Sequence, residues 1–414
     1  MTRTIQRQIK NLFKLIRGQP LSYPPLGSAT LDADDVRLVR YWLKHPQDWY
    51  NIDQVNAFEK EFASWNGSRH AVAFMGGRVA LTAAINALRM KPGDEVIVPG
   101  YTCVVVPNAF SYAGIRVVYS DIELETYGLD ASLLQSKITP RTKAILIQHL
   151  YGLVCRDYEA ILHFAHNNNL SIIEDCAHAT GATYKGRNVG TRSDVAFYSA
   201  EQSKVFTTIQ GGIAVTDSPE IAKNLREFSD KADFPSRHSI TNLLYGVILN
   251  YYTFKHPHRW ITRDFARLLY GKYKRPSTTP QELCGIQPVA YGQRMPAPLA
   301  SLGCNQLAKL DMYNQRRREA ATIWDHWARM HDFTPPLVIE HSVPVFLRYP
   351  LLVDKDMKQN IDWAKTELNV KAGVWFISHI HPTYVFLSDC PNAQYAVERC
   401  INFPCILRKI RDYK

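Results

Sequence analysis

Short apolar runs rich in β-branched residues alternate with amphipathic segments between residues 71 and 228. The runs predict strands at 71–74, 95–99, 116–120, 144–149, 171–175, 195–199 and 212–216, and segments such as 78–88 and 157–166 have helical spacing. Strands that are apolar on both faces and alternate with helices are typical of a covered, mainly parallel sheet. The pattern therefore predicts an α/β fold with a mainly parallel, seven-stranded sheet and helices on both of its faces.

The segments on either side of this block predict further units. Two helices are expected between residues 31 and 65, the second at 54–63. After Pro298 a helical pattern runs to about Met330, followed by a region of paired strands at 343–353 and by helices at 360–368 and 393–401. We therefore expect an N-terminal extension at 1–27, a large domain at 28–298 with an insertion at 231–287, and a smaller C-terminal α+β domain at 299–414.

Composition narrows the class of protein. The 414 residues are 46% hydrophobic and 21% charged, which is the composition of a globular chain. No apolar run approaches the length of about 18 residues that a membrane-spanning helix needs. The 8 cysteines are scattered without a CxxC pair or zinc spacing. We read them as buried residues of a reducing compartment and, because no signal-peptide pattern is present, we expect a cytoplasmic protein.

The net charge of +11 is concentrated in two segments. Residues 1–17 contribute +5 and residues 255–275 contribute +6, so the rest of the chain is formally neutral. Both segments also carry or adjoin apolar and aromatic residues, which favours peripheral contact with an anionic membrane. No helix-turn-helix, zinc-finger or RNP-like pattern accompanies the charge, and binding to nucleic acid is therefore not expected.

The residues that carry chemistry follow two of the predicted strands. Asp175 ends one strand, while Ser199 ends another and is followed five residues later by Lys204. In doubly wound sheets the carboxyl ends of the strands border the ligand site. A lysine beside a buried crevice forms a Schiff base when its amine is partly neutral, and a carboxylate holds a protonated ring nitrogen. Together these groups indicate a site for pyridoxal 5′-phosphate.

Residues 172–186, Ile-Ile-Glu-Asp-Cys-Ala-His-Ala-Thr-Gly-Ala-Thr-Tyr-Lys-Gly, resemble the hallmark of the DegT/DnrJ/EryC1/StrS family. Members of this family are fold-type I, pyridoxal-phosphate-dependent sugar aminotransferases. Shorter segments at 91–97, 141–144, 149–152, 311–318 and 390–393 resemble other family motifs in the same order. The resemblance covers roughly residues 28–230 and 288–405.

The resemblance implies a role for each matching residue. Lys204 forms the Schiff base and then moves the proton between substrate and cofactor, and Asp175 pairs with the pyridinium nitrogen. Ala177 packs on a face of the ring, and His178, where many members have Gln, lies near the phenolic oxygen. Ser199 contacts the phosphate.

Residues 76–78 are expected to lie at the phosphate as well. The backbone of Gly76 and Gly77 begins a predicted helix, and helix N-termini favour phosphate. Many relatives have Ser-Gly-Thr where this chain has Gly76, Gly77 and Arg78. Arg78 is either a phosphate donor or a solvated residue of the first helical turn. We favour the phosphate contact, because a cation opposes the helix dipole there unless an anion is bound.

Three further positions depart from the family pattern. Where relatives stack an aromatic residue on the cofactor this chain has Cys103, and Tyr101 is an alternative source of that face. Relatives use an Asn of the partner subunit to touch the phosphate; the matching position is Gly292, and Arg294 or Gln293 is the expected replacement.

His379 and His381 fall where relatives have a histidine-containing loop near the substrate. Two histidines one residue apart also occur in metal sites, but no third ligand is evident in the sequence. A structural or substrate-facing role is therefore favoured, and no metal is expected.

The resemblance implies a homodimeric enzyme with its active sites at the subunit interface. Glutamate is the expected amino donor, and a keto- or aldehydo-sugar is the expected acceptor, either nucleotide-linked or of the oxidised Kdo type. Such an enzyme would serve the biosynthesis of cell-envelope polysaccharide or lipopolysaccharide. The alternative is a non-catalytic, pyridoxal-phosphate-binding regulator or scaffold on the same fold.

Overall fold

The computed structural model describes the chain outside residues 1–22, 24–25, 28, 256–277, 289–290 and 408–414. The basic segment 1–17 and all but the first residue of the basic segment 255–275 therefore lie outside the described residues. Their expected contact with a membrane stays a prediction. Among the helices of the described residues, none is both long enough and apolar enough to cross a membrane.

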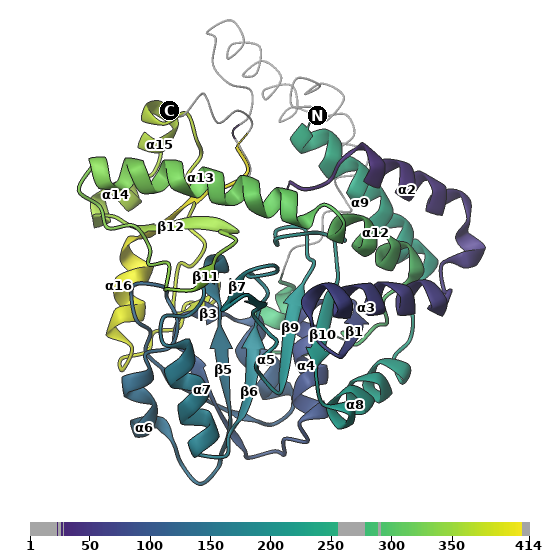
Figure 1. Cartoon of the computed structure of the whole chain (residues 1–414), viewed down its shortest axis with the longest axis horizontal. Helices are drawn as coiled ribbons and strands as arrows, with labels where there is room; N and C mark the ends of the chain where they lie inside the picture. Colours follow the sequence, from purple (N-terminus) through teal and green to yellow (C-terminus); the bar gives the residue numbers. More distant parts are fainter. Residues whose placement is uncertain (1–22, 24–25, 28, 256–277, 289–290, 408–414) are drawn as a thin grey trace, which may run out of the picture.

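A seven-stranded sheet forms the centre of the molecule, in the order β1-β10-β9-β6-β5-β2-β4 (Figure 1). In that order the strands are His70–Phe74, Gly212–Thr216, Val195–Ser199, Ser171–Asp175, Thr142–Gln148, Glu95–Pro99 and Arg116–Ser120. Neighbouring strands from β9 to β4 pair in parallel, and only β10 runs against the others. The predicted mainly parallel sheet is confirmed, and each of its strands begins within two residues of the predicted position.

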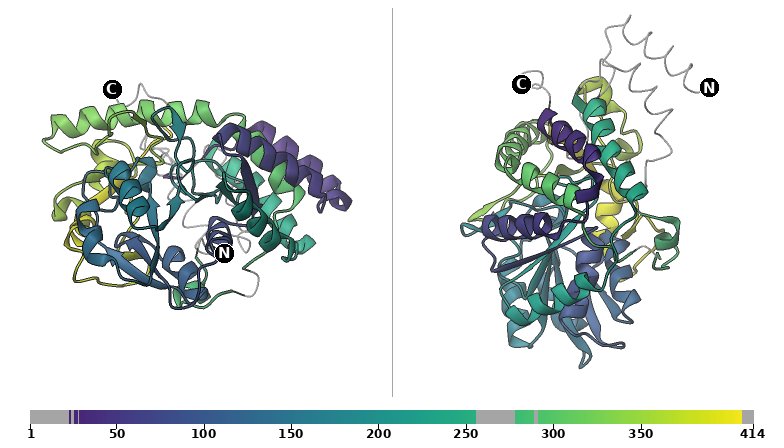
Figure 2. Two further views of the ribbon diagram at one scale, coloured as in Figure 1. Left: turned by 60° about the horizontal axis from the view of Figure 1, so that its bottom comes forward. Right: turned by 90° about the vertical axis from the view of Figure 1, so that its right-hand side faces the viewer.

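Each face of the sheet has its own hydrophobic core, because side chains alternate along a strand. Ala144 and Leu146 of β5 pack in one core, whereas Ile145 and Ile147 of the same strand pack in the other. The first core is completed by α4 (Gly77–Ala87), α5 (Val105–Tyr112) and α8 (Pro219–Asp230). The second is completed by α3 (Ile52–Asn66), α7 (Tyr158–Asn167) and α12 (Ala297–Leu307). Helices on both sides of the sheet are visible in Figure 2.

The C-terminal elements gather at one end of the molecule (Figure 1). They are α13 (Leu310–Met330), β12 (Arg348–Leu352), α14 (Lys355–Gln359), α15 (Trp363–Glu367), α16 (Pro391–Arg399) and β14 (Cys400–Pro404). Their core also contains three buried tyrosines from loops of the sheet, Tyr101, Tyr127 and Tyr151. This unit is therefore packed directly on the loops at one edge of the sheet. The division at residue 298 stays a prediction.

Three expectations for this region were wrong in detail. The single helix expected up to Met330 is two helices, because Lys309 leaves the helical path and contacts Asp34 and Asp35 at the start of α2 (Ala33–Lys44). The two strands expected to pair within 343–353 belong to different sheets. Strand β11 (Ser342–Val343) pairs with β7 (Thr183–Tyr184), and β12 pairs with β14.

The third error concerns the last helix, which was expected at 393–401. Helix α16 ends at Arg399, and β14 begins at the next residue. All five residues of β14 are buried, because the strand is packed within the C-terminal core.

The described part of the insertion 231–287 is mainly one long helix. Helix α9 (Arg237–Lys255) lies beside α2 (Figures 1 and 2), and the short helix α11 (Pro280–Leu283) ends the segment. Residues of both helices line the cavity described below. The insertion is therefore part of the wall of the site.

Candidate active site

A cavity of about 1010 Å³ lies at the carboxyl ends of β1, β6 and β9. It is bordered by the first turn of α4, by the loop that follows β9, and by residues of α9 and β12. Nine residues predicted to form the site line it: Gly76, Gly77, Arg78, Cys103, Asp175, Ala177, His178, Ser199 and Lys204. Tyr101, Arg294, His379 and His381 do not line this cavity.

The amine of Lys204 lies 3.0 Å from Nε2 of His178. Burial lowers the pKa of the Lys204 amine, against the opposing charges of Glu201 and Asp175. Burial also holds the pKa of His178 well below its ordinary value, so its ring is neutral. The backbone N–H of Tyr151 donates to Nδ1 of His178 (3.3 Å), which leaves the ring proton on Nε2. His178 can therefore donate to a neutral Lys204 amine, the form that attacks a carbonyl carbon.

Asp175 is placed at the cavity by the last position of β6. Its carboxylate accepts a hydrogen bond from the backbone N–H of Ala177 (2.9 Å). Burial raises the pKa of Asp175 to about 6, although the hydrogen bond from Ala177 and the charge of Lys204 act in the opposite direction. A buried carboxylate of this kind gains most from a cationic partner, such as a protonated ring nitrogen.

A buried hydrogen-bonded pair lies next to Asp175 in the sequence and at the end of the neighbouring strand. His149 Nε2 lies 2.9 Å from Glu174 Oε2, and both side chains are fully buried. The N–H of Cys155 donates to Nδ1 of His149, and the N–H of Gly190 donates to Glu174. Burial raises the pKa of Glu174, but the hydrogen bonds from His149 and Gly190 outweigh it, and the net pKa is lowered.

Cys176 completes a group of three potential metal ligands with His149 and Glu174, all within 4.8 Å of one another. Burial holds the pKa of the Cys176 thiol well above its ordinary value. Both ring nitrogens of His149 and Oε2 of Glu174 are already engaged in hydrogen bonds within the chain.

Close backbone packing explains the glycines at the start of α4. A Cβ on Gly77 would lie 2.8 Å from Cβ of Ser199, and a Cβ on Gly212 would lie 2.3 Å from the carbonyl carbon of Gly76. The loop after β1 therefore touches β9 and β10 only because these positions lack side chains. The first turn of α4 and the Ser199 hydroxyl border one corner of the cavity, and their donors suit a phosphate.

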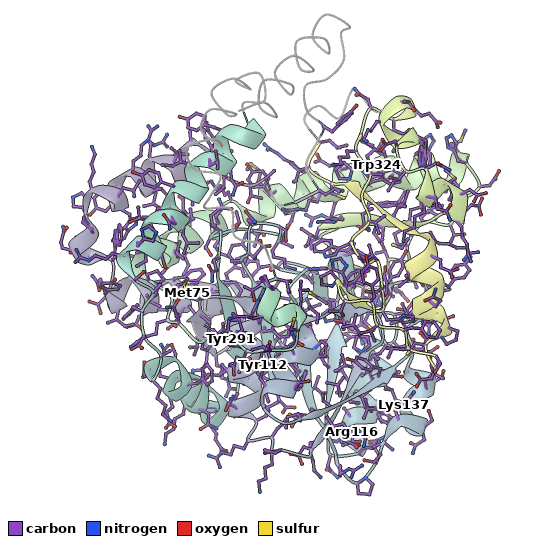
Figure 3. All side chains as sticks on the ribbon, turned by 180° about the vertical axis from the view of Figure 1, so that it is seen from behind. Met75, Tyr112, Arg116, Lys137, Tyr291 and Trp324 are labelled. Atoms are coloured by element: carbon purple, nitrogen blue, oxygen red, sulfur yellow. The ribbon has the colours of Figure 1, made fainter. Side chains whose placement is uncertain are left out.

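Arg78 has an anionic partner within its own chain. Its guanidinium forms an ion pair with Glu282, whose side chain is 2% exposed. Glu282 also caps α11 through the N–H of Thr279 (2.8 Å). Tyr291, which lies beside Tyr112 in Figure 3 with ring centres 5.5 Å apart, donates to the carbonyl of Arg78. The unfavourable position of the Arg78 cation at the N-terminal end of α4 is thus offset by a carboxylate from the insertion. Arg78 is not a solvated residue.

Tyr101 and Cys103 were the two residues expected to pack against a face of the cofactor ring, and only one of them lines the cavity. Tyr101 is fully buried in the C-terminal core, with its hydroxyl 3.2 Å from that of Tyr151 and its ring packed on Phe376. The expectation that Tyr101 offers this face is therefore wrong for the described cavity, because core packing holds the ring elsewhere. Cys103 lines the cavity instead.

Arg294 lies near the end of β1, where it bridges to Phe74 through the backbone. Its side chain pairs with Asp230 (3.1 Å) and stacks over the ring of Phe234. It does not line the cavity of its own chain, and its expected contact with a second subunit stays a prediction.

His381 belongs to the short strand β13 (Ile380–His381), which pairs in parallel with β3 (Thr102–Cys103), and His379 directly precedes this strand. His379 Nε2 lies 3.3 Å from the carbonyl of Cys390. Burial lowers the pKa of His381 to about 4, and the N–H of Ile377 donates to its Nδ1. Both rings are engaged in local packing, which is the structural alternative named above.

Sequence reasoning missed two residues of the C-terminal unit. Arg348 lines the cavity, and its guanidinium carbon lies 3.4 Å from the ring centre of Trp375. The Trp375 ring in turn lies 4.3 Å from that of His178. One signal was available: Arg348 is the single charge in an otherwise apolar run at 343–353.

The comparisons with known proteins are decisive at the level of the family. Residues 30–409 match the profile of the DegT/DnrJ/EryC1/StrS aminotransferase family. The chain belongs to this family. It is a pyridoxal-phosphate-dependent sugar aminotransferase of fold type I, which confirms the resemblance and the predicted cofactor.

Two curated relatives match most of the chain. The aminotransferase is 30% identical over 398 residues to the spore coat polysaccharide biosynthesis protein SpsC of Bacillus subtilis, covering 93% of this chain and 91% of the relative. It is 42% identical over 304 residues to the GDP-perosamine synthase of Escherichia coli O157:H7, covering 73% and 71%. The solved structure of the aminotransferase TlmJ from Streptoalloteichus hindustanus has the same fold, with a TM-score of 0.73, 22% identity and coverage of 94% and 96%.

Proposed function

We propose that this aminotransferase moves an amino group from glutamate to a keto- or aldehydo-sugar used in cell-envelope polysaccharide or lipopolysaccharide. The observation that carries the proposal is the pairing of Lys204 with His178 in a cavity that also contains Asp175. A non-catalytic regulator would not need a desolvated lysine whose pKa is lowered beside a neutral histidine.

The residues present fit the cofactor. Gly76, Gly77 and Ser199 offer hydrogen-bond donors at one corner of the cavity, where a side chain on Gly77 would collide with Ser199. Asp175 offers a buried carboxylate and Lys204 an amine. Pyridoxal phosphate supplies an aldehyde for amine exchange and a ring that withdraws electrons from the reacting carbon.

The roles of the side chains follow from their positions. Lys204 would hold the cofactor through its amine and would move a proton at the reacting carbon. His178 orients the Lys204 amine through Nε2, and Asp175 would keep a ring nitrogen of the cofactor protonated. Ser199 and the first turn of α4 would hold the phosphate.

We infer that the acceptor is nucleotide-linked. Support comes from the cavity, which at about 1010 Å³ is large for a cofactor and an amino acid alone, and from relatives named for GDP- and dTDP-linked amino sugars. The test is a panel of GDP- and dTDP-linked 3-keto and 4-keto hexoses with oxidised Kdo as the unlinked member, each with glutamate as donor. Amination of a nucleotide-linked member alone supports the inference, and amination of oxidised Kdo alone contradicts it.

We also propose that the enzyme is a homodimer. The segment at 377–386 exposes several large apolar side chains, notably Tyr384 (89% exposed) and Phe386 (68% exposed). A second copy of this chain would cover them, as is usual for exposed apolar patches. Light scattering after size-exclusion chromatography should give twice the chain mass of 47.3 kDa, and a mass of one chain would contradict the proposal.

A further inference from the structure

Helix α9 of the insertion presents two different faces along its length. One face holds Ile240, Leu244 and Val247, which are fully buried in the hydrophobic core on that side of the sheet. The other face lines the cavity with residues at the spacing i, i+3, i+4, i+7 and i+8, which lie together on one side of a helix. We call these residues the cavity stripe of α9: Asn242, Tyr245, Gly246, Leu249 and Asn250.

The cavity stripe is polar but carries no charge. No Asp, Glu, Lys or Arg occurs between Ser239 and Phe254. Asn242 is half-buried, and its side-chain amide forms no hydrogen bond with the described residues. An amide offers two donor hydrogens and an acceptor oxygen, which suit the hydroxyl groups of a neutral ligand. Phosphate, in contrast, is usually bound by cations or by the N-terminus of a helix.

Gly246 is a glycine in the interior of a helix, where alanine is more favourable. Its φ lies outside the left-handed region, and a Cβ there would meet only Cγ2 of Ile209, at 3.6 Å, which is an ordinary contact. Gly77 and Gly212 are different, because a Cβ at either would collide with a neighbouring element. Packing within the chain therefore does not require a glycine at 246. The missing side chain leaves space in the cavity that a ligand can occupy.

The cavity stripe lies beside the loop that carries Lys204. Nδ2 of Asn250 lies 3.4 Å from Oε1 of Gln202, two residues before Lys204. Gly246 approaches Ile209 in the same loop, and Gln202, Lys204 and Ile209 all line the cavity. In an aminated sugar the ring holds the carbon that reacts, so the ring is the part of the acceptor that must come close to Lys204. The stripe is therefore placed to contact the sugar ring.

We propose that α9 binds the sugar ring of a nucleotide-linked acceptor. Asn242 forms a hydrogen bond with a hydroxyl group of the ring, and the ring occupies the space that Gly246 leaves. The diphosphate of the nucleotide lies outside the uncharged stripe. This inference rests on the proposed function, since it assigns part of the insertion to the acceptor of that reaction.

The test uses three variants of the cofactor-loaded protein. Asn242→Leu keeps the approximate shape of the side chain and removes its hydrogen bonds, and Gly246→Ala adds one methyl group to the stripe. Thr241→Val is the matched control, because Thr241 lies on α9 outside the cavity and its hydroxyl donates to the carbonyl of Arg237 (2.8 Å). Calorimetry gives the dissociation constants of GDP-mannose and dTDP-glucose, which have no keto group to aminate, and those of GDP and dTDP. Thermal unfolding reports the stability of each variant.

The comparison is made with the sugar nucleotide that the wild-type enzyme binds more tightly. We expect Asn242→Leu to weaken it by about 2- to 10-fold, the contribution of one hydrogen bond, and to leave binding of its nucleoside diphosphate unchanged. Gly246→Ala should unfold at a higher temperature than wild type, because alanine favours the helix, and yet bind the sugar nucleotide more weakly. Thr241→Val should bind both ligands as wild type does.

Two results would overturn the proposal. Equal weakening of the sugar nucleotide and of its nucleoside diphosphate in Asn242→Leu would assign the stripe to the nucleotide. Unchanged binding of the sugar nucleotide in both Asn242→Leu and Gly246→Ala would show that the stripe does not contact the sugar.

The reaction with L-glutamate in the absence of sugar is followed separately by absorbance. A wild-type enzyme that reacts with glutamate but binds neither sugar nucleotide would overturn the role of α9 and leave the proposed donor in place. A wild-type enzyme that binds a sugar nucleotide but does not react with glutamate would contradict the proposed donor, while the calorimetric comparison still decides the role of α9.

Discussion

The amine of Lys204 and Nε2 of His178 lie 3.0 Å apart, and the histidine is the donor. This direction follows from the N–H of Tyr151, which occupies Nδ1 and places the ring proton on Nε2. Burial lowers the pKa of each group and so favours its neutral form. The site is therefore preorganised to present a lysine amine that is ready to react.

The first prediction concerns the pH dependence of Lys204. Because burial lowers the pKa of its amine below 10.5, the neutral form is present at lower pH than in an exposed lysine. The rate at which apoprotein combines with added pyridoxal phosphate should rise with pH through a midpoint below 10.5. A midpoint at or above that value would show that the amine is not desolvated. The exposed Lys185 provides the comparison, since its pKa is raised by its hydrogen bond to Glu159.

The second prediction concerns the close approach of α4 to β9. In Gly77→Ala the new methyl group would lie 2.8 Å from Cβ of Ser199, so one of the two elements must shift. We expect a loss of about 1–3 kcal/mol in unfolding free energy and weaker binding of the cofactor, measured by urea denaturation and by titration of the apoprotein. Gly292→Ala is the matched control for the denaturation measurement, because a Cβ there meets nothing within 4 Å. Equal behaviour of the two variants would refute the packing argument.

The third prediction concerns the buried pair of His149 and Glu174. His149→Leu leaves the Glu174 carboxylate buried without its main partner, and such changes cost about 3–5 kcal/mol. Since the pKa of Glu174 is lowered in the folded protein, its stabilisation is present above 4.5 and is lost as the pH falls through the lowered folded pKa. Urea denaturation at pH 7 and pH 4 checks both points. A variant as stable as wild type at pH 7 would contradict the role of the pair.

The fourth prediction concerns the ion pair between Arg78 and Glu282. Both residues line the cavity, and Glu282 is the more buried. Arg78→Ala should destabilise the protein more than Glu282→Ala, because it leaves a carboxylate that is 2% exposed without its cation, whereas the Arg78 side chain is 21% exposed. The double variant should be more stable than the sum of the single losses predicts. Additive losses in a double-mutant cycle would show that the two groups do not interact.

The large α/β unit was predictable because its strands are buried on both faces. Runs such as Glu95–Pro99 and Val195–Ser199 are wholly buried, and their apolar character marks both their position and their type. The single helix expected up to Met330 was wrong, because the break at Lys309 depends on ion pairs with residues more than 250 positions earlier. Likewise, β11 and β12 each pair with a strand distant in sequence, and hydrophobic pattern does not specify such partners.

The residues of the site also divide into those that the sequence identifies and those that only distant contacts place. Asp175, Ser199 and Lys204 were identifiable because each follows a strand whose end could be located in the sequence. Arg348, which lines the cavity, and Trp375, on which it stacks, were missed, because they are placed by contacts with β12 and β14 and not by a motif. The partner of Arg78 was also missed, since Glu282 comes from an insertion without a recognisable pattern.

The central claim is tested most directly by adding excess L-glutamate to the purified, cofactor-loaded enzyme in the absence of any sugar and recording its absorbance. We predict that the band of the lysine-bound cofactor disappears in favour of the pyridoxamine form, with release of one 2-oxoglutarate per site. Lys204→Ala should fold but lack both the initial band and turnover. An unchanged spectrum in the wild-type enzyme, or transamination that persists in Lys204→Ala, would contradict the account.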